Sequence, residues 1–168
     1  MRKRFEQQLA IGQKPISQTQ ISIKRKDSLN ELLAALLAIF VDQVCNEQVF
    51  NILGNKLSKQ KLKIGRKGMD LWQVFVLSQV RLCLNISYDK LVDLANNHYA
   101  IRHLMGVERD FGYERIEFEY QNIYDNVTLL DDKTVQQLNE AIIMMGHKVF
   151  KKKEGAPLRL KTDSHRFS

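Results

Sequence analysis

The sequence predicts a mainly α-helical protein, a helical bundle followed by one β-strand. Its 168 residues are rich in Leu, Ile, Glu, Gln and Lys, with only two prolines and eight glycines. Over most of the chain, apolar residues recur at steps of three and four, the spacing with which a helix buries one face. Near the C-terminus the step becomes two, because Leu158, Leu160 and Thr162 alternate with charged residues. Such a strand has no partner within a helical chain.

The first helices follow a basic N-terminal stretch. Residues 1–27 show little periodicity, and we expect them to form a flexible, solvated basic arm. Ser28 and Glu31 have the spacing of a capping box, which predicts the start of the first helix. An apolar stripe then covers 29–40. A second helix is expected over about 46–58, antiparallel to the first, because a short connection favours that packing.

A basic linker ends this helical hairpin, so that hairpin and linker together occupy residues 28–64. The stretch KLSKQKLKIGRK at 56–67 holds six basic residues and no acidic one. Lysine and arginine neutralise the phosphates of a nucleic-acid backbone, so this stretch is the first candidate for DNA contacts. The candidate residues are Lys56, Lys59, Lys61, Lys63, Arg66 and Lys67. The net charge of +7 also favours a polyanionic partner.

The remaining helices fall within residues 65–155. They are predicted over about 70–84, 87–97, 99–105, 117–128 and 131–149. The first is apolar nearly all round and should be buried at the centre. We expect Asn85 to end it, Ser87 to cap the next helix and Gly146 to interrupt the last.

The helices over 70–106 follow one another in an order compatible with a helix-turn-helix, although any three-helix bundle produces the same pattern. If one of them enters the major groove, its polar side chains are the donors to the bases. These side chains are Asn96, Asn97, His98 and Arg102. From the pattern alone, plain helix packing is the more common explanation, and the adjacent basic stretch 56–67 strengthens the DNA-reading hypothesis.

Four sequence blocks resemble a known family. They are GRKGMDLWQVFVL at 65–77, NISYDKLVDLANNHYAIRHLMGV at 85–107, FEYQNIYDNVTLLDDKTVQQLNEAI at 118–142 and LRLKTDS at 158–164. In this order they resemble the N-terminal half of bacterial DDE-type insertion-sequence transposases, with the ISNCY group and InsH-related proteins nearest in pattern. The resemblance implies a helical DNA-binding region that precedes an RNase H-like catalytic domain.

The same resemblance gives Asp163 a candidate role. It matches the first of the family's three catalytic carboxylates, which bind Mg²⁺ or Mn²⁺ and begin on the first strand of the RNase H-like domain. We therefore expect residues 156–168 to be the start of such a domain, truncated just after Asp163. Two-metal chemistry requires several carboxylates. A chain with only one of them is expected to hold no metal and to be inactive in DNA cleavage.

Double-stranded DNA at the ends of an insertion sequence is the expected partner. The alternative is a helical protein-interaction module that pairs through the stripe at 29–40, with copies of itself or with a full-length transposase. A pseudogene product without function is the remaining possibility. The N-terminus lacks a signal peptide, and the longest apolar run, 32–41, is shorter than the roughly 20 residues that cross a bilayer. We expect a cytoplasmic protein that does not enter a membrane.

Overall fold

The chain folds mainly into α-helices. The computed structural model describes residues 2–22, 27–57, 68–111 and 114–150. In chain order its elements are η1 (Ile16–Gln18), α1 (Ser28–Val41), α2 (Gln43–Leu57), α3 (Leu71–Leu84), α4 (Tyr88–Asn97), α5 (Tyr99–Leu104), α6 (Tyr120–Val127) and α7 (Asp132–Val149). The mainly α class is confirmed. The strand predicted within 156–168 lies outside the described residues.

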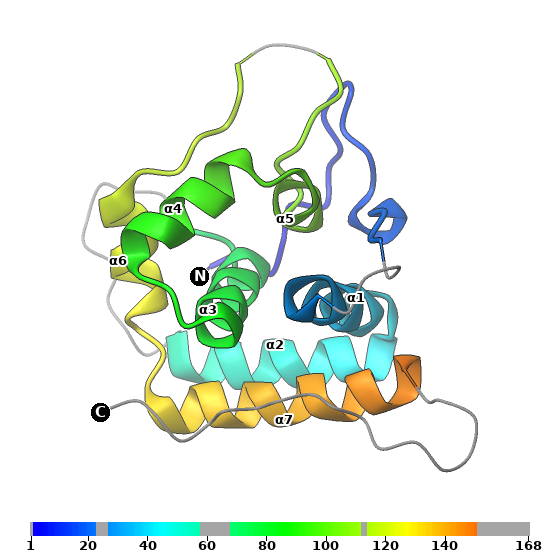
Figure 1. Cartoon of the computed structure of the whole chain (residues 1–168), viewed down its shortest axis with the longest axis vertical. Helices are drawn as coiled ribbons and strands as arrows, with labels where there is room; N and C mark the ends of the chain where they lie inside the picture. Colours follow the sequence, from blue (N-terminus) through cyan, green and yellow to red (C-terminus); the bar gives the residue numbers. More distant parts are fainter. Residues whose placement is uncertain (1, 23–26, 58–67, 112–113, 151–168) are drawn as a thin grey trace.

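The helices pack in layers (Figure 1). α2 and α7 lie side by side, and α1 and α3 cross above them. α4 packs on α3 and α6, while α5 packs on α1 and α4. The predicted antiparallel hairpin of α1 and α2 is wrong, because their axes meet at 98°. Asp42 forms this corner, and its carboxylate accepts the N–H groups of Val44 and Cys45 at 3.1 and 3.0 Å.

Within the described ranges, no single helix has the length and apolar composition needed to cross a bilayer. α1 and α2 reach that composition only as a bent pair. Apolar side chains of both helices pack in the protein core. Leu33, Leu36 and Ile39 of α1 and Val49 and Leu53 of α2 have no exposed surface.

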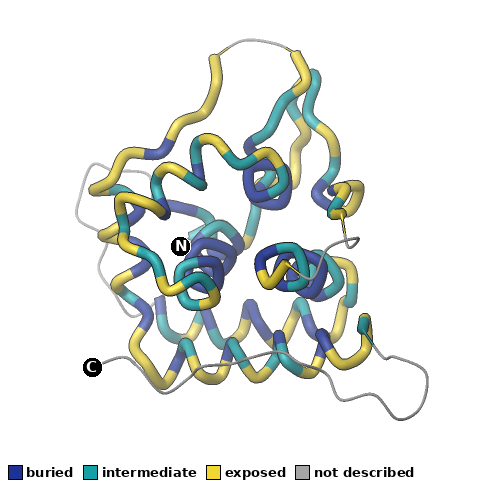
Figure 2. The backbone as a smooth tube through the Cα atoms, in the orientation of Figure 1, coloured by how far each residue is buried: buried dark blue, intermediate teal, exposed yellow. Residues whose placement is uncertain are grey.

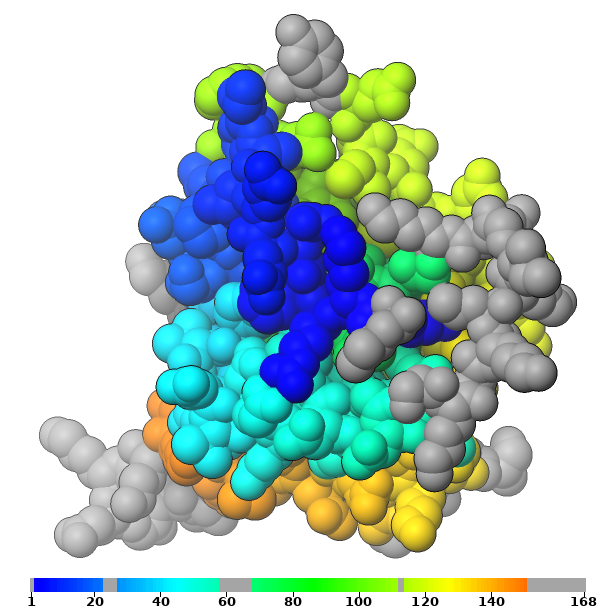
Figure 3. All heavy atoms as spheres, turned by 180° about the vertical axis from the view of Figure 1, so that it is seen from behind, coloured from blue at the N-terminus to red at the C-terminus, as the bar shows by residue number. Residues whose placement is uncertain are grey.

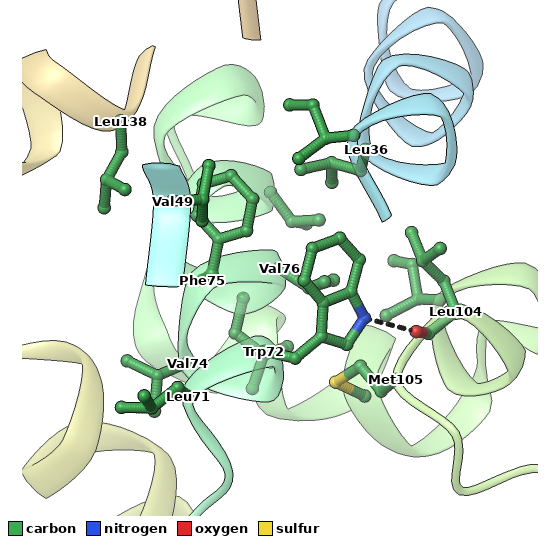
Figure 4. Packing of buried hydrophobic residues seen from close by; sticks show 14 of the residues in the cluster. Leu36, Val49, Leu71, Trp72, Val74, Phe75, Val76, Leu104, Met105 and Leu138 are labelled. Atoms are coloured by element: carbon green, nitrogen blue, oxygen red, sulfur yellow. Dashed lines mark hydrogen bonds between the residues drawn. The ribbon is translucent and has the colours of Figure 1, made fainter. Parts of the chain in front are cut away.

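The buried stretches of the helices face the interior of the bundle (Figure 2). Trp72 lies in one continuous apolar core (Figure 4). Its side chain is fully buried, and its indole N–H donates to the Leu104 carbonyl at 2.7 Å. The rings of Phe40, Phe50 and Phe75 surround it at centroid distances of 4.9, 6.3 and 5.5 Å. The prediction that α3 is the buried central helix is therefore confirmed.

The apolar stripe of α1 is part of the same core. Leu29, Leu32, Leu33, Leu36 and Ile39 are each at most 8% exposed. α1 packs through these residues on α3, α5 and α7. Most of this stripe is therefore covered within one chain, while Leu37 and Phe40 are half-buried, and pairing of two chains through it stays a prediction.

The helix ends follow the sequence signals in part. Asn85 ends α3 in the left-handed conformation, with φ 49°, and Ser87 caps α4, both as predicted. Asp27, not Ser28, is the N-cap of α1, and its carboxylate accepts a backbone N–H two residues further on at 3.0 Å. The predicted interruption at Gly146 is wrong. This glycine is buried, and α7 continues through it.

The N-terminal segment 2–22 packs against the helices (Figure 3), so the predicted solvated arm is wrong for these residues. The carbonyls of Lys3 and Arg4 accept the N–H groups of Leu71 and Trp72, both at 2.9 Å. The first N–H groups of a helix have no partner within the helix. The N-terminal segment therefore completes the hydrogen bonding of α3.

Side chains anchor the same segment to α1 and α2. The Phe5 ring packs on Phe40 and Phe50, with centroid distances of 5.1 and 6.0 Å. The Arg4 guanidinium donates to both carboxylate oxygens of Glu47, at 2.6 and 2.8 Å, and also covers the ring of Phe50. Two parallel hydrogen bonds fix the orientation of Arg4 relative to Glu47, and the opposite charges of the two side chains add attraction.

A buried imidazole lies where the N-terminal segment meets α5. His103 is 3% exposed, and neither ring nitrogen makes a well-formed hydrogen bond within the described residues. Burial lowers the pKa of His103, and Lys14 lowers it further, while Asp110, the Pro15 carbonyl and Glu108 raise it. The net shift keeps this imidazole neutral over a wider pH range than an exposed histidine.

Replacing Phe5 tests the docking of the N-terminal segment. Phe5→Ala removes a half-buried ring, so the free energy of unfolding should fall by about 2 kcal/mol, less than for a fully buried phenylalanine. Urea titration followed by circular dichroism measures it. The matched control, Gln7→Ala, changes an exposed residue of the same segment and should have little effect. If Phe5→Ala and Gln7→Ala both leave the free energy of unfolding unchanged, the N-terminal segment is a solvated arm after all.

His103 should make stability depend on pH. Its folded-state pKa lies below the unfolded value of about 6.5, so the unfolded chain binds more protons as the pH falls through that value. Stability is therefore lost on acidification. His98, whose pKa burial also lowers, acts in the same direction. Melting temperatures between about pH 7 and pH 5.5 should fall less in His103→Leu than in the wild type. The control Gln136→Leu changes an exposed uncharged residue of α7 and should leave the pH dependence unchanged.

Candidate nucleic-acid interface

The region predicted to read DNA folds into the consecutive helices α3, α4 and α5. Residues 85–87 join α3 to α4, and His98 alone joins α4 to α5. α5 has six residues, and its positions 101–104 are buried. A helix that lies in the core cannot enter a DNA groove. The exposed residues of α4 include Asp89, Asp93 and Asn97.

Arg102 is buried in the protein rather than exposed. Its side chain is 2% exposed, and its Nε donates to Glu108 at 2.7 Å. The other guanidinium nitrogens lie 3.4 Å from the Ala95 carbonyl and 3.5 Å from the Val107 carbonyl. This placement gives Arg102 a structural role, holding the loop after α5 against α4, and removes it from the proposed base contacts.

Asn96 is also bonded within the protein. Its side-chain amide donates to the Phe118 carbonyl at 2.9 Å and accepts from the Phe118 N–H at 2.8 Å. Arg115 donates to the backbone carbonyl of the same asparagine. Because both ends of its side chain are occupied, Asn96 fastens the segment before α6 to α4. Its amide oxygen and one of its two amide hydrogens are therefore engaged within the protein.

Asn97 and His98 differ in what they offer. Asn97 is exposed, and its amide donates to Asp93 at 2.8 Å, while Asp93 also pairs with Lys90 at 2.8 Å. His98 is half-buried, and its Nδ1 accepts the N–H of Ile101 at 3.3 Å as the N-cap of α5. Of the four base-reading candidates, Asn97 alone lies exposed on the outer face of α4.

Lys56 connects two helices. Its ammonium group pairs with Asp131, the N-cap of α7, which also accepts the Thr134 N–H at 2.9 Å. The hydrogen bond from Lys56, followed by those from Thr134, lowers the pKa of Asp131 far below its usual range. Lys56 therefore joins the end of α2 to the start of α7, so a phosphate would have to compete with Asp131 for it.

The other predicted contacts lie outside the described residues. These are Lys59, Lys61, Lys63, Arg66, Lys67 and Asp163. Over the described ranges, no three His, Cys, Asp or Glu side chains gather in a way that would hold a metal ion. Of the predicted phosphate contacts, Lys56 alone falls within the described residues.

Positive charge is unevenly distributed along the chain. The described residues hold 12 of the 26 lysines and arginines but 17 of the 19 aspartates and glutamates. The other 14 basic residues and two acidic ones fall in 23–26, 58–67 and 151–168. The helical body is thus net acidic, and the basic excess of the chain belongs to these segments.

Comparison with known proteins adds no assignment. No family model, curated protein or solved structure matches the chain. The sequence blocks at 65–164 and the contacts described above are therefore the basis of the proposals that follow.

Two residues with structural roles were missed from the sequence. Glu108 binds Arg102, and Phe118 binds Asn96, which lies 22 positions earlier in the chain. One signal was available for Arg102, because apolar residues flank it at Ile101 and at 104–105 within a short helix. An arginine in such surroundings usually has a buried partner. No local pattern marks Phe118, whose backbone supplies the bonds to Asn96.

Arg102→Ala should destabilise the fold. It leaves Glu108, whose side chain is 23% exposed, without its cation, so the free energy of unfolding should fall by about 3 kcal/mol. Chemical denaturation measures the loss. Lys133→Ala, an exposed change on α7, is the control and should shift it by less than about 0.5 kcal/mol. Unchanged stability together with altered DNA sequence preference would instead return Arg102 to base reading.

Proposed function

We propose that the chain binds double-stranded DNA, as the helical DNA-binding part of an insertion-sequence transposase. The distribution of charge carries this proposal. Five basic residues and no acidic one fall within 58–67, directly between α2 and α3, whereas the helical body is net acidic. An acidic body repels a polyanion, so we assign the affinity for phosphates to the basic segments. The order of sequence blocks supports the transposase assignment.

α4 is the helix that we propose for sequence reading. The basic segment 58–67 leads into α3, and α4 follows α3 after one short turn. A duplex held by that segment therefore lies within reach of the α3–α4 unit. Asn97 is exposed there, and asparagine pairs with adenine through two hydrogen bonds in the major groove. Phosphate contacts would fix the position of the duplex, and Asn97 would select its sequence.

Catalysis is not part of this proposal. By the resemblance, Asp163 would be the first ligand for Mg²⁺ or Mn²⁺ in an RNase H-like site. The helical residues described here bind and position DNA in our proposal, and no cleavage step is assigned to them. The ends of an insertion sequence are the proposed target, which places the protein in the cytoplasm with the bacterial chromosome.

Neutralising the basic segment tests the proposal. A variant with Lys61, Lys63, Arg66 and Lys67 changed to Gln should bind every duplex more weakly. Each lost phosphate contact reduces the slope of log affinity against log salt by roughly 0.9, so four reduce it by about 3.6. Fluorescence anisotropy with labelled duplexes across a salt series measures both quantities.

Two control variants make this measurement specific. Lys133→Gln with Lys148→Gln removes positive charge from α7 and should leave the salt slope nearly unchanged. Asn97→Ala should keep the slope but reduce the preference among duplexes of different sequence, because base contacts carry specificity. An unchanged slope in the four-residue variant would refute the assignment of DNA binding to this segment.

A further inference from the structure

Three tyrosines gather on the surface formed by α4 and α6. Tyr120 and Tyr124 stack with centroids 5.9 Å apart and an interplanar angle of 12°. Tyr88 meets them edge-on at 6.3 and 4.9 Å. Tyr120 is 42% exposed and Tyr124 is 41% exposed, so both residues are partly open to solvent. We call Tyr88, Tyr120 and Tyr124 the tyrosine patch.

The tyrosine patch already accommodates one cation. The guanidinium carbon of Arg81, at the C-terminal end of α3, lies 4.3 Å from the centroid of the Tyr88 ring. The negative face of an aromatic ring attracts such a group. Arg81 occupies Tyr88 alone, and the exposed pair Tyr120 and Tyr124 has no cation in any contact that the structure describes.

An acidic residue adjoins each tyrosine in the sequence. Asp89 follows Tyr88, Glu119 precedes Tyr120, and Asp125 follows Tyr124. All three carboxylates are exposed, and Glu119 makes no capping hydrogen bond with its side chain. Exposed tyrosine rings and exposed carboxylates of the same two helices both attract lysine and arginine side chains.

We propose that the tyrosine patch binds the lysine- and arginine-rich segment 58–67 of a second copy of this chain. Charge complementarity supports this occupant. The segment carries five basic residues and no acidic one, while the helical body carries 12 basic and 17 acidic residues. Every copy of the chain therefore carries both halves of the contact. The two copies can exchange segments symmetrically, as in a two-fold dimer.

This contact goes beyond DNA binding and is tested without DNA. Sedimentation velocity of the full chain should show concentration-dependent association at about 0.05 M NaCl and largely monomeric protein at about 0.5 M, because salt screens exposed charges. A patch variant, Tyr120→Ala with Tyr124→Ala, should weaken association about ten-fold through loss of both ring faces. Tyr120→Phe with Tyr124→Phe keeps the ring faces and should associate like the wild type.

A complementation arm identifies the occupant. The segment variant changes Lys61, Lys63, Arg66 and Lys67 to Gln, and alone it should associate as weakly as the patch variant. A mixture of the two variants should associate again, because one supplies an intact segment and the other an intact patch. This result requires contact between copies, which an attachment of the segment to its own chain would not produce.

Circular dichroism of each variant shows whether it is folded. If the patch variant does not fold, Glu119→Gln with Asp125→Asn replaces it, since these exposed changes remove negative charge and keep the rings. This charge variant should also weaken association. Monomeric wild-type protein at low salt, association unaffected by either kind of patch variant, or no recovery in the mixture would each overturn the proposal.

Discussion

The burial of Trp72 is the constraint on which the rest of the fold depends. Its indole N–H cannot stay unpaired in the core, and the Leu104 carbonyl at 2.7 Å satisfies it. That bond fixes the end of α5 over α3. The Trp72 backbone N–H donates to Arg4, and its ring packs on Phe40 and Phe50. One residue therefore joins the N-terminal segment, α1, α2, α3 and α5.

Polar side chains extend this arrangement to the outer helices. Arg102 holds the loop after α5 through Glu108, and Asn96 holds the segment just before α6 through Phe118. Both side chains lie in the region that resembles a DNA-binding unit, yet their hydrogen-bonding groups face inward. A buried charge without a partner is costly, so these bonds maintain the fold. Few polar side chains of this region are therefore free to contact DNA. The DNA-binding proposal consequently depends mainly on the separation of charge between the acidic helices and the basic segments.

Local signals in the sequence predicted much of the secondary structure. Helical spacing placed α3, α4, α5 and α7 within a residue or so of their observed bounds, and Asn85 and Ser87 ended and capped helices as expected. The N-terminal segment was mistaken for a solvated arm because its anchors, Phe5 and the Lys3 and Arg4 carbonyls, have no periodicity. The site was predicted less well. Asn97 stayed exposed, whereas Arg102 and Asn96 are engaged by residues of other segments.

Composition and spacing by themselves determined the helical class, the central position of α3 and the basic segment at 58–67, because these properties depend on neighbours along the chain. Tertiary structure alone decided which polar side chains are free. Whether Arg102 contacts solvent depends on Glu108 and two carbonyls, and whether three tyrosines form one surface depends on how α4 packs on α6. The physical reason is that these hydrogen bonds and ring contacts join residues of different helices and loops, and no local period records such a partner.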